Sequence, residues 1–169
     1  MKMPDIVVDG FYWTKEPWGR ALRSRHLEEV ADHFFTSLPL RLRGENGQEE
    51  RDWSLVASTA GVPADRLHRL KQVHGNRVVI APRPVDSGVD TEGAWPHADI
   101  ILSNDPAVAL AVQVADCVPL LIADRRLGAV AAAHAGWRGT ALNVAGTAVA
   151  ALGREFGSHP GDLVVAHGP

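Results

Sequence analysis

The stretch Ala131-Ala-Ala-His134-Ala-Gly-Trp137-Arg138-Gly139-Thr140 joins an apolar segment to a helical one. Residues 128–133 are small and apolar, which predicts a strand covered on both faces. Apolar residues then recur at helical spacing as far as residue 156, and Gly157 supplies a stop. These apolar positions are Ala141, Leu142, Ala145, Ala148, Val149, Leu152 and Phe156. The sequence therefore predicts a buried strand that leads directly into a long helix.

An imidazole, an indole and a guanidinium group lie at this junction, from His134, Trp137 and Arg138. The carboxyl end of a strand and the amino end of a helix are where open sheets bind ligands and where free N–H groups attract anions. A cation is unfavourable at that end of a helix unless an anion compensates it. We therefore predict that Arg138 binds an anion together with the start of the helix. The structural alternatives are a helix-capping His134, a packing Trp137 and a surface Arg138.

Two further segments place possible metal ligands beside apolar strands. His74 lies in Lys71-Gln-Val-His-Gly-Asn76, before the apolar run 78–80, and Cys117 lies in Val114-Ala-Asp-Cys-Val-Pro119. Two imidazoles and one thiolate from His74, Cys117 and His134 suit Zn²⁺, and three protein ligands leave a fourth position for water or substrate. The alternative is that all three are structural, since a lone Cys is most often a small hydrophobe and histidines have many structural uses.

Length and composition favour one domain over residues 1–169, because a chain of 169 residues that is 46% hydrophobic can bury a core. The net charge is −3, and the 17 basic and 20 acidic residues form no basic stripe, so we expect no nucleic-acid partner. We expect neither a secretory signal nor a membrane span. The single Cys excludes an internal disulfide and fits a soluble, cytoplasmic protein. The apolar strand expected over 162–169 stops abruptly, so we expect a chain truncated at its C-terminus.

The remaining pattern predicts several shorter elements and one long loop. We expect a polar loop over 40–51, followed by a short helix over 52–60 with Asp52 as its cap and Gly61 as its stop. We expect a strand over 70–80 that carries His74 near its middle. The other expected elements are strands over 6–13 and 33–37, an irregular loop of the kind used as a lid over 81–96, and a strand-rich region over 100–139.

Several standard sites are excluded. The sequence contains neither a G-x-G-x-x-G nor a P-loop motif, and it lacks the G-x-S-x-G elbow. His26-Leu-Glu28 matches half of the zinc-deaminase signature, but one Cys cannot supply the P-C-x-x-C half. The eight histidines form no H-x-H pair, so a trinuclear copper cluster with a blue-copper site has too few ligands.

Together, the motifs Gln72-Val-His74-Gly75, Ala115-Asp-Cys117-Val-Pro119 and His134-Ala-Gly-Trp-Arg-Gly139 resemble the laccase-domain family, from about residue 33 to 169. That family is known as multicopper polyphenol oxidase, peptidoglycan-editing factor and purine nucleoside phosphorylase with adenosine deaminase activity. The resemblance implies an α+β fold, a layered sandwich of mixed β-sheets flanked by helices and related to Cys–His toxin deamidases. It also implies zinc held by His74, Cys117 and His134.

Two features depart from the family pattern. Members usually have Arg after Phe-Thr-Thr, whereas this chain reads Phe35-Thr-Ser-Leu38. The family also continues past the Gly-Pro at residue 169, into a segment that helps to close the site. We therefore expect that residues 1–169 lack a segment that helps to close the site in the family.

The leading functional hypothesis is a zinc-dependent purine nucleoside enzyme whose partners are a small nucleoside and phosphate. Arg138 would hold phosphate and Trp137 would contact ribose or base. Deamination of adenosine would use zinc-activated water, with Asp116 either moving protons or orienting a ligand. Three alternatives remain: a Cys–His amide hydrolase on cell-wall-related amides, with Cys117 as nucleophile and His134 or His74 as base; a copper polyphenol oxidase; and a non-catalytic zinc-binding protein.

Overall fold

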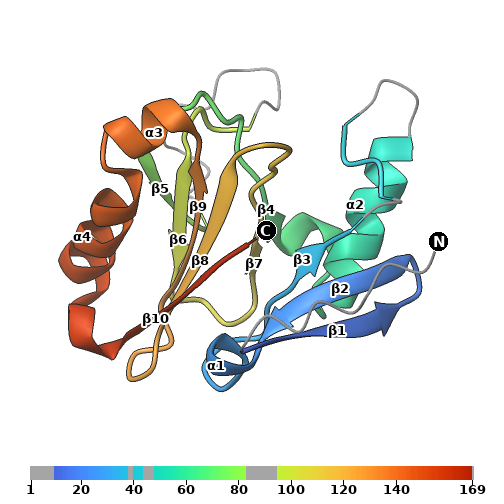
Figure 1. Cartoon of the computed structure of the whole chain (residues 1–169), viewed down its shortest axis with the longest axis horizontal. Coiled ribbons are helices and arrows are strands. Elements are labelled where there is room, and N and C mark those ends of the chain that lie inside the picture. Colours follow the sequence, from blue (N-terminus) through green and yellow to red (C-terminus); the bar gives the residue numbers. More distant parts are fainter. Residues whose placement is uncertain (1–9, 38–39, 44–47, 83–94, 169) are drawn as a thin grey trace.

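A five-stranded mixed sheet carries the strand-to-helix junction (Figure 1). The computed structural model describes residues 10–37, 40–43, 48–82 and 95–168. The strand order is β10-β8-β9-β6-β5, in which only β5 and β6 run parallel to each other. Their bounds are β5 (Val78–Ile80), β6 (Ile100–Ser103), β8 (Val118–Asp124), β9 (Val130–Ala135) and β10 (Leu163–His167).

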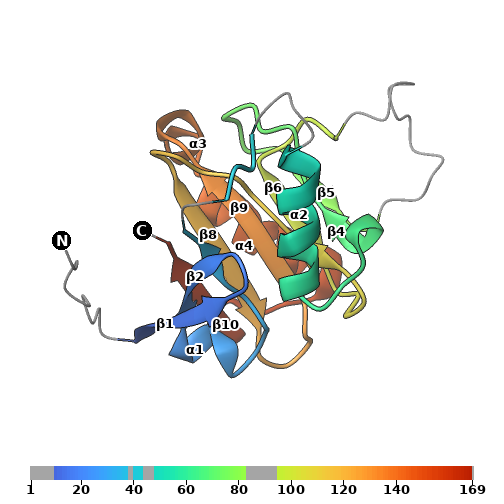
Figure 2. The ribbon, with the colours of Figure 1, turned by 90° about the vertical axis from the view of Figure 1, so that its right-hand side faces the viewer.

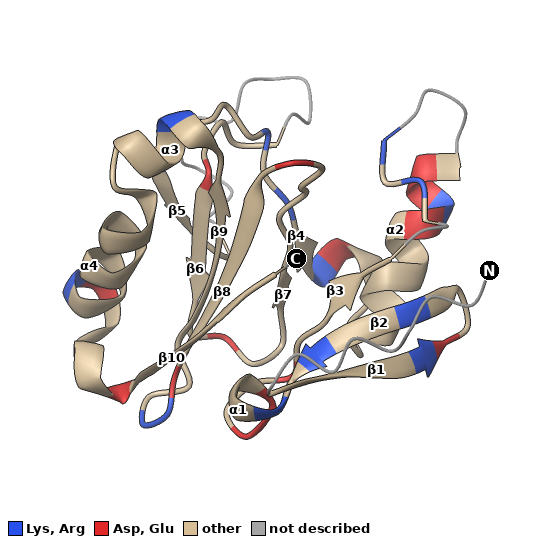
Figure 3. Ribbon diagram, in the orientation of Figure 1, with Lys and Arg blue, Asp and Glu red and all other residues tan. Residues whose placement is uncertain are grey.

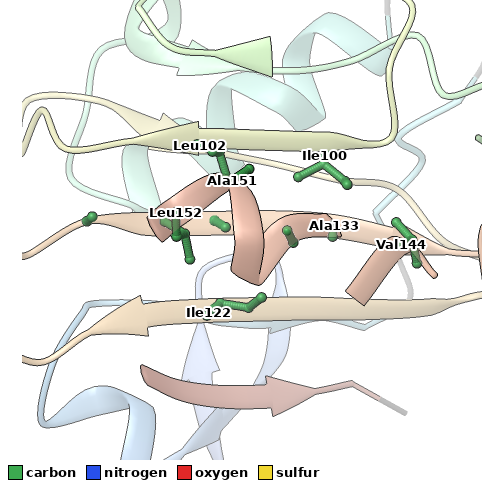
Figure 4. Close-up of a cluster of buried hydrophobic side chains, with 10 residues drawn as sticks. Ile100, Leu102, Ile122, Ala133, Val144, Ala151 and Leu152 are labelled. Carbon is green, nitrogen blue, oxygen red and sulfur yellow. The ribbon is translucent and has the colours of Figure 1, made fainter. Parts of the chain in front are cut away.

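Two helices cover one face of this sheet, namely α3 (Trp137–Ala141) and α4 (Val144–Phe156). Small alanines on β9 let α4 approach closely, and its buried side chains pack on β6, β8 and β9 (Figure 4). The core cluster comprises Ile100, Leu102, Ile122, Ala129, Ala131, Ala133, Val144, Ala148, Ala151 and Leu152. Truncating a fully buried leucine such as Leu152 to Ala costs about 2–5 kcal/mol of stability.

The helix expected to run unbroken to residue 156 is instead two helices. Asn143 adopts the left-handed conformation with φ 58°, and its side chain accepts a hydrogen bond from the Gly146 N–H, so it caps α4. Gly157 is the left-handed C-cap, with φ 78°, which confirms the predicted stop. The predicted strand over 128–133 is confirmed with a shift of two residues, because Gly128 takes a turn conformation with φ 68°.

The opposite face of the main sheet is covered by the amino-terminal part of the chain (Figure 2). An antiparallel sheet of β1 (Phe11–Glu16), β2 (Gly19–Ser24) and β3 (Phe35–Thr36) packs with α1 (Arg25–Glu28) on β8 and β10. Helix α2 (Gln48–Thr59) lies near the parallel pair β4 (Leu67–His68) and β7 (Ala109–Leu110). Short 3₁₀ turns complete the described chain, η1 (Ala64–Arg66) and η2 (Pro160–Asp162).

Mixed sheets flanked by helices confirm the expected α+β class. Strand β1 and helix α2 carry both acidic and basic residues, whereas β2 carries only basic ones (Figure 3). Within the described ranges, no helix combines the length and the apolar character needed to cross a bilayer.

Three of the shorter predictions need correction. The predicted loop over 40–51 is confirmed over 40–43 but wrong over its last four residues, because α2 already begins at Gln48. The cap at Asp52 is wrong, because Asp52 lies buried within that helix. The Asp52 carboxylate instead accepts hydrogen bonds from the Arg41 N–H and the Gln48 side chain. The 70–80 strand is also wrong, since only its last three residues form β5.

The other predictions are confirmed in part or lie outside the described residues. The 33–37 strand is reduced to the two residues of β3, and β10 confirms a strand at the end of the chain. Strand β1 begins at Phe11, while residues 6–9 of the predicted 6–13 strand lie outside the described residues. Most of the predicted 81–96 loop, residues 83–94, lies outside them as well.

Candidate metal centre

The three predicted ligands meet at one end of the main sheet. Cys117 directly precedes β8, and His134 belongs to β9, where it pairs in register with Pro119. His74 comes from the segment that leads to β5. The potential ligand atoms of His74, Cys117 and His134 all lie within 4.8 Å of one another. Three side chains that are far apart in sequence therefore share one site.

This cluster has the chemistry and the space for a metal ion. Tetrahedral zinc with its usual bond lengths places neighbouring N and S ligand atoms about 3.3–3.6 Å apart, so shifts of about 1 Å complete the geometry. His134 is buried, Cys117 half-buried and His74 exposed, which leaves the site accessible from one side. The two imidazole rings are nearly perpendicular, with 4.8 Å between their centroids.

Gly136 keeps the space between the ligands open. A Cβ atom at this position would lie 2.9 Å from Cδ2 of His74 and 3.1 Å from Sγ of Cys117. The backbone of Gly136 is extended, with φ −77° and ψ 170°, so its conformation does not require glycine. Glycine is therefore needed at position 136 because a side chain there would collide with the candidate ligands.

Asp99, which the sequence reasoning missed, holds two of the candidate ligands. It directly precedes β6 and is fully buried. Its Oδ1 accepts hydrogen bonds from the backbone N–H of His74 (2.9 Å) and from Nδ1 of His134 (2.8 Å). Its Oδ2 accepts from the backbone N–H groups of Val73 (3.2 Å) and Gly75 (2.8 Å). The one signal available in the sequence was an acidic residue directly before the apolar run Ile100-Ile-Leu102.

The backbone at His74 is unlike the predicted strand. His74 has φ 62°, a left-handed conformation that costs an L-residue about 1–2 kcal/mol. The three N–H groups of residues 73–75 converge on the Asp99 carboxylate, and these bonds offset that cost. A long-range contact thus turns the chain out of the β conformation just where the imidazole is presented.

Gln72 connects the His74 segment to the Cys117 segment. Its side-chain Nε2 donates to the Gln113 carbonyl, and its Oε1 accepts from the Gln113 N–H, both at 2.7 Å. The loop is held on its other side by Asn76, whose side-chain amide donates to the Leu142 carbonyl at 2.9 Å. Residues 72–76 are therefore tied to both of the segments that flank them at the site.

The other predicted site residues lie close to the candidate ligands in sequence. Trp137 is 75% exposed, and the Arg138 guanidinium carbon lies 5.1 Å from the centre of its ring. Both residues belong to the five-residue α3 and not to the long helix α4. The prediction that Arg138 binds an anion therefore rests on its charge and not on the dipole of a long helix. Asp116 is exposed and adjacent to Cys117.

The fold and the site together define an α+β domain with a candidate metal centre of two imidazoles and one thiolate. The family model described as multi-copper polyphenol oxidoreductase laccase matches residues 24–169. The chain belongs to that family.

Curated relatives and a solved structure agree with this assignment. A purine nucleoside phosphorylase of Deinococcus radiodurans is 39% identical over 114 residues, which cover 68% of this chain and 41% of the relative. One of Streptomyces coelicolor is 37% identical over 115 residues, covering 68% and 45%. The crystal structure of YlmD from Geobacillus stearothermophilus superposes with a TM-score of 0.74 at 29% identity, over 93% of this chain and 64% of that one. The chain spans less than half the length of these two curated relatives.

Proposed function

We propose that this chain carries the metal centre of a zinc-dependent purine nucleoside enzyme that cleaves adenosine- or inosine-type nucleosides with phosphate. The convergence of His74, Cys117 and His134 on one accessible point carries the proposal. The names of the curated relatives support the substrate class. When bound, zinc supplies a Lewis acid that polarises an oxygen atom in the site.

Side chains around the cluster suit the two substrates. Val73 and Val118 are 48% and 40% exposed, and each adjoins a candidate ligand in sequence. Together with Trp137, they offer apolar contacts to a base or a ribose. Arg138 supplies a positive charge for phosphate, and Asp116 supplies a carboxylate that can accept or return a proton. The alternative reaction at the same site is deamination of adenosine, in which Asp116 would transfer a proton to the leaving amino group.

An assay with inosine or adenosine and inorganic phosphate tests this proposal. Phosphorolysis releases the free base and forms a sugar phosphate, so we expect both products in equal amounts and only when phosphate is present. Ammonia release from adenosine without phosphate identifies deamination. If neither reaction occurs with zinc-loaded protein, the proposal is wrong.

One observation favours a second candidate, a Cys–His amide hydrolase. The Asp99–His134 hydrogen bond of 2.8 Å, beside Cys117, has the order of groups found in catalytic triads. The two candidates differ in the state of the thiol, because a thiolate bound to zinc is not free to attack an amide. Alkylation of Cys117 that is slow in zinc-loaded protein and fast after chelation supports the zinc enzyme. Equally fast alkylation in both forms supports the hydrolase.

Because the family model is described as a multi-copper oxidoreductase, copper is a second metal to test at this site. Two histidines and one cysteine are also the equatorial ligands of blue-copper sites. Oxidation of phenols that appears only in copper-loaded protein, without nucleoside turnover, would assign the polyphenol oxidase function instead.

A further inference from the structure

We propose that Asp99 is a positioning residue that presets the metal centre by fixing both histidines before any metal binds. It holds His134 through the imidazole ring and His74 through the backbone. This inference rests on the metal site of the proposed function but not on the identity of the substrate.

The contact with His134 determines which ring nitrogen faces the cluster. The Asp99 carboxylate can only accept hydrogen bonds, so the Nδ1 atom of His134, at 2.8 Å, carries the proton. The Nε2 atom then keeps its lone pair, which is the form that a metal ion requires. Because both side chains are buried, with exposed fractions of 3% for His134 and 0% for Asp99, water does not compete for this bond.

The backbone fixes Asp99 as firmly as its side chain fixes the histidines. The His134 N–H donates to the Asp99 carbonyl at 2.8 Å, and the next residues pair in register, Ile100 with Ala133. Asp99 and His134 are thus joined by a main-chain bond and a side-chain bond. The carboxylate therefore stands on a rigid strand end from which it can hold a loop.

The contacts with the loop set the position of His74. Three consecutive N–H groups, those of Val73, His74 and Gly75, converge on the two carboxylate oxygens. These bonds accompany the left-handed backbone of His74 that directs its imidazole toward Cys117 and His134. One buried carboxylate therefore sets both the direction of one ligand and the tautomer of another.

An asparagine cannot replace this carboxylate, because every hydrogen-bonding partner of Asp99 described above is an N–H donor. If the amide NH₂ of Asp99→Asn faces residues 73 and 75, two backbone donors lose their acceptor. If it faces His134, the ring must accept at Nδ1 and move its proton to Nε2, which blocks metal binding there. Either arrangement weakens the metal site without changing the size of the side chain.

Asp124→Asn provides a matched control. Asp124 is also buried, with an exposed fraction of 1%, and its Oδ1 accepts the N–H groups of Arg126 (2.7 Å) and Leu127 (3.0 Å). It ends β8, whereas Cys117 precedes the first residue of that strand. The amide oxygen of Asp124→Asn can accept both of these bonds, so this variant removes a buried carboxylate charge but should leave the metal site intact.

The experiment has two readouts on the full chain. In metal-free wild-type protein, ¹⁵N NMR of labelled histidine should show His134 protonated at Nδ1. Competition with a zinc chelator should show that Asp99→Asn raises the zinc Kd about 10–100-fold, the usual loss for a residue that orients a metal ligand. Asp124→Asn should keep both the tautomer and the Kd of the wild type.

The outcomes separate this inference from the proposed function. His134 protonated at Nε2 and not at Nδ1 in the wild type, or a zinc Kd for Asp99→Asn within twofold of the wild type, overturns the role of Asp99. The wild-type NMR readout decides the matter even if Asp99→Asn fails to fold. Zinc binding without nucleoside turnover overturns only the proposed function, and an absence of zinc binding in the wild type overturns both.

Discussion

Gln72 and Gln113 are joined by two hydrogen bonds of 2.7 Å, in which the side-chain amide of Gln72 pairs with both main-chain polar groups of Gln113. Gln113 precedes Cys117 by four residues, and Gln72 precedes His74 by two. This pair therefore ties together the segments that carry two of the three candidate ligands. The link is independent of metal, so it can be broken without touching a ligand.

Gln72→Ala should lower the free energy of unfolding by about 1–3 kcal/mol, since each of the two hydrogen bonds contributes about 0.5–1.5 kcal/mol. It should also weaken zinc binding, because the Cys117 segment loses its tie to the His74 loop. Urea denaturation and chelator competition measure the two effects.

Gln113→Ala is the control for this variant. The Gln113 side chain donates to the Leu42 carbonyl at 2.5 Å, whereas the pair with Gln72 uses only main-chain atoms of Gln113. This variant should lose stability but retain the wild-type zinc affinity. Equal zinc affinities for the two variants would contradict the role given to Gln72.

Gly136→Ala should impair metal binding by filling the space between the ligands. The added methyl group meets His74 at 2.9 Å and Cys117 at 3.1 Å. Overpacking of this kind costs about 1–3 kcal/mol, which corresponds to about 5–150-fold in zinc Kd if it falls on the bound state. Isothermal titration with zinc gives the Kd.

Gly75→Ala tests whether any added methyl near the site has this effect. A Cβ at position 75 would make ordinary contacts, 3.6 Å from Asp99 and 3.8 Å from Val73. Its zinc Kd should stay close to that of the wild type. A larger loss for Gly75→Ala than for Gly136→Ala would refute the steric argument.

The chemistry of the site could be predicted from the sequence, but its local geometry could not. His74, Cys117 and His134 stood out because N and S ligands lay beside apolar strands, and the structure brings them together. The strand predicted around His74 failed because Asp99, 25 residues away, captures three consecutive N–H groups. Periodicity does not detect such a contact, and an acid before a strand looks like any other surface residue.

The fold shows the same division between local and long-range causes. The apolar run predicted β9, and the helical spacing predicted Ala148 and Leu152 on the buried face of α4. The spacing missed the buried Val144 and Ala151 and included the exposed Ala145. It also ran through the break at Asn143, because apolar residues continue on both sides. The start of α2 was missed because its first turn is polar, and Asp52 resembled a cap. One of the two partners of Asp52, the Arg41 N–H, lies 11 residues before it, and the local pattern does not predict that contact.

Stability should fall between pH 7.5 and 5.5 partly because of His33. Burial lowers the pKa of His33 below its ordinary 6.5, and the hydrogen bond to the Ala31 carbonyl offsets this in part. Its Nε2 accepts the Ser24 N–H at 2.8 Å, which requires the neutral ring. The unfolded chain therefore binds the proton first, so this contribution is present above about pH 6.5 and is lost as the pH falls through the folded-state pKa.

Urea unfolding of metal-free protein at the two pH values tests the role of His33. His33→Gln should show a smaller loss of stability between pH 7.5 and 5.5 than the wild type. Some loss should remain, because burial also lowers the pKa of His68. Identical pH slopes for His33→Gln and the wild type would exclude the assigned role of His33.

Arg138→Ala should raise the KM for phosphate in nucleoside cleavage, because it removes the exposed cation next to Trp137. Zinc content should not change, since Arg138 is not among the candidate ligands. Steady-state kinetics with phosphate as the varied substrate measure the effect. An unchanged KM would rule out this role and point to another cation for phosphate.

The central claim is that His74, Cys117 and His134 form a zinc site on which nucleoside turnover depends. The most direct test is zinc stoichiometry, measured with turnover, for wild-type protein purified without added metal and for Cys117→Ser. We predict one zinc per chain with turnover in the wild type, and loss of both in Cys117→Ser, because one sulfur atom serves both. Full turnover of inosine or adenosine by zinc-free protein would contradict the account.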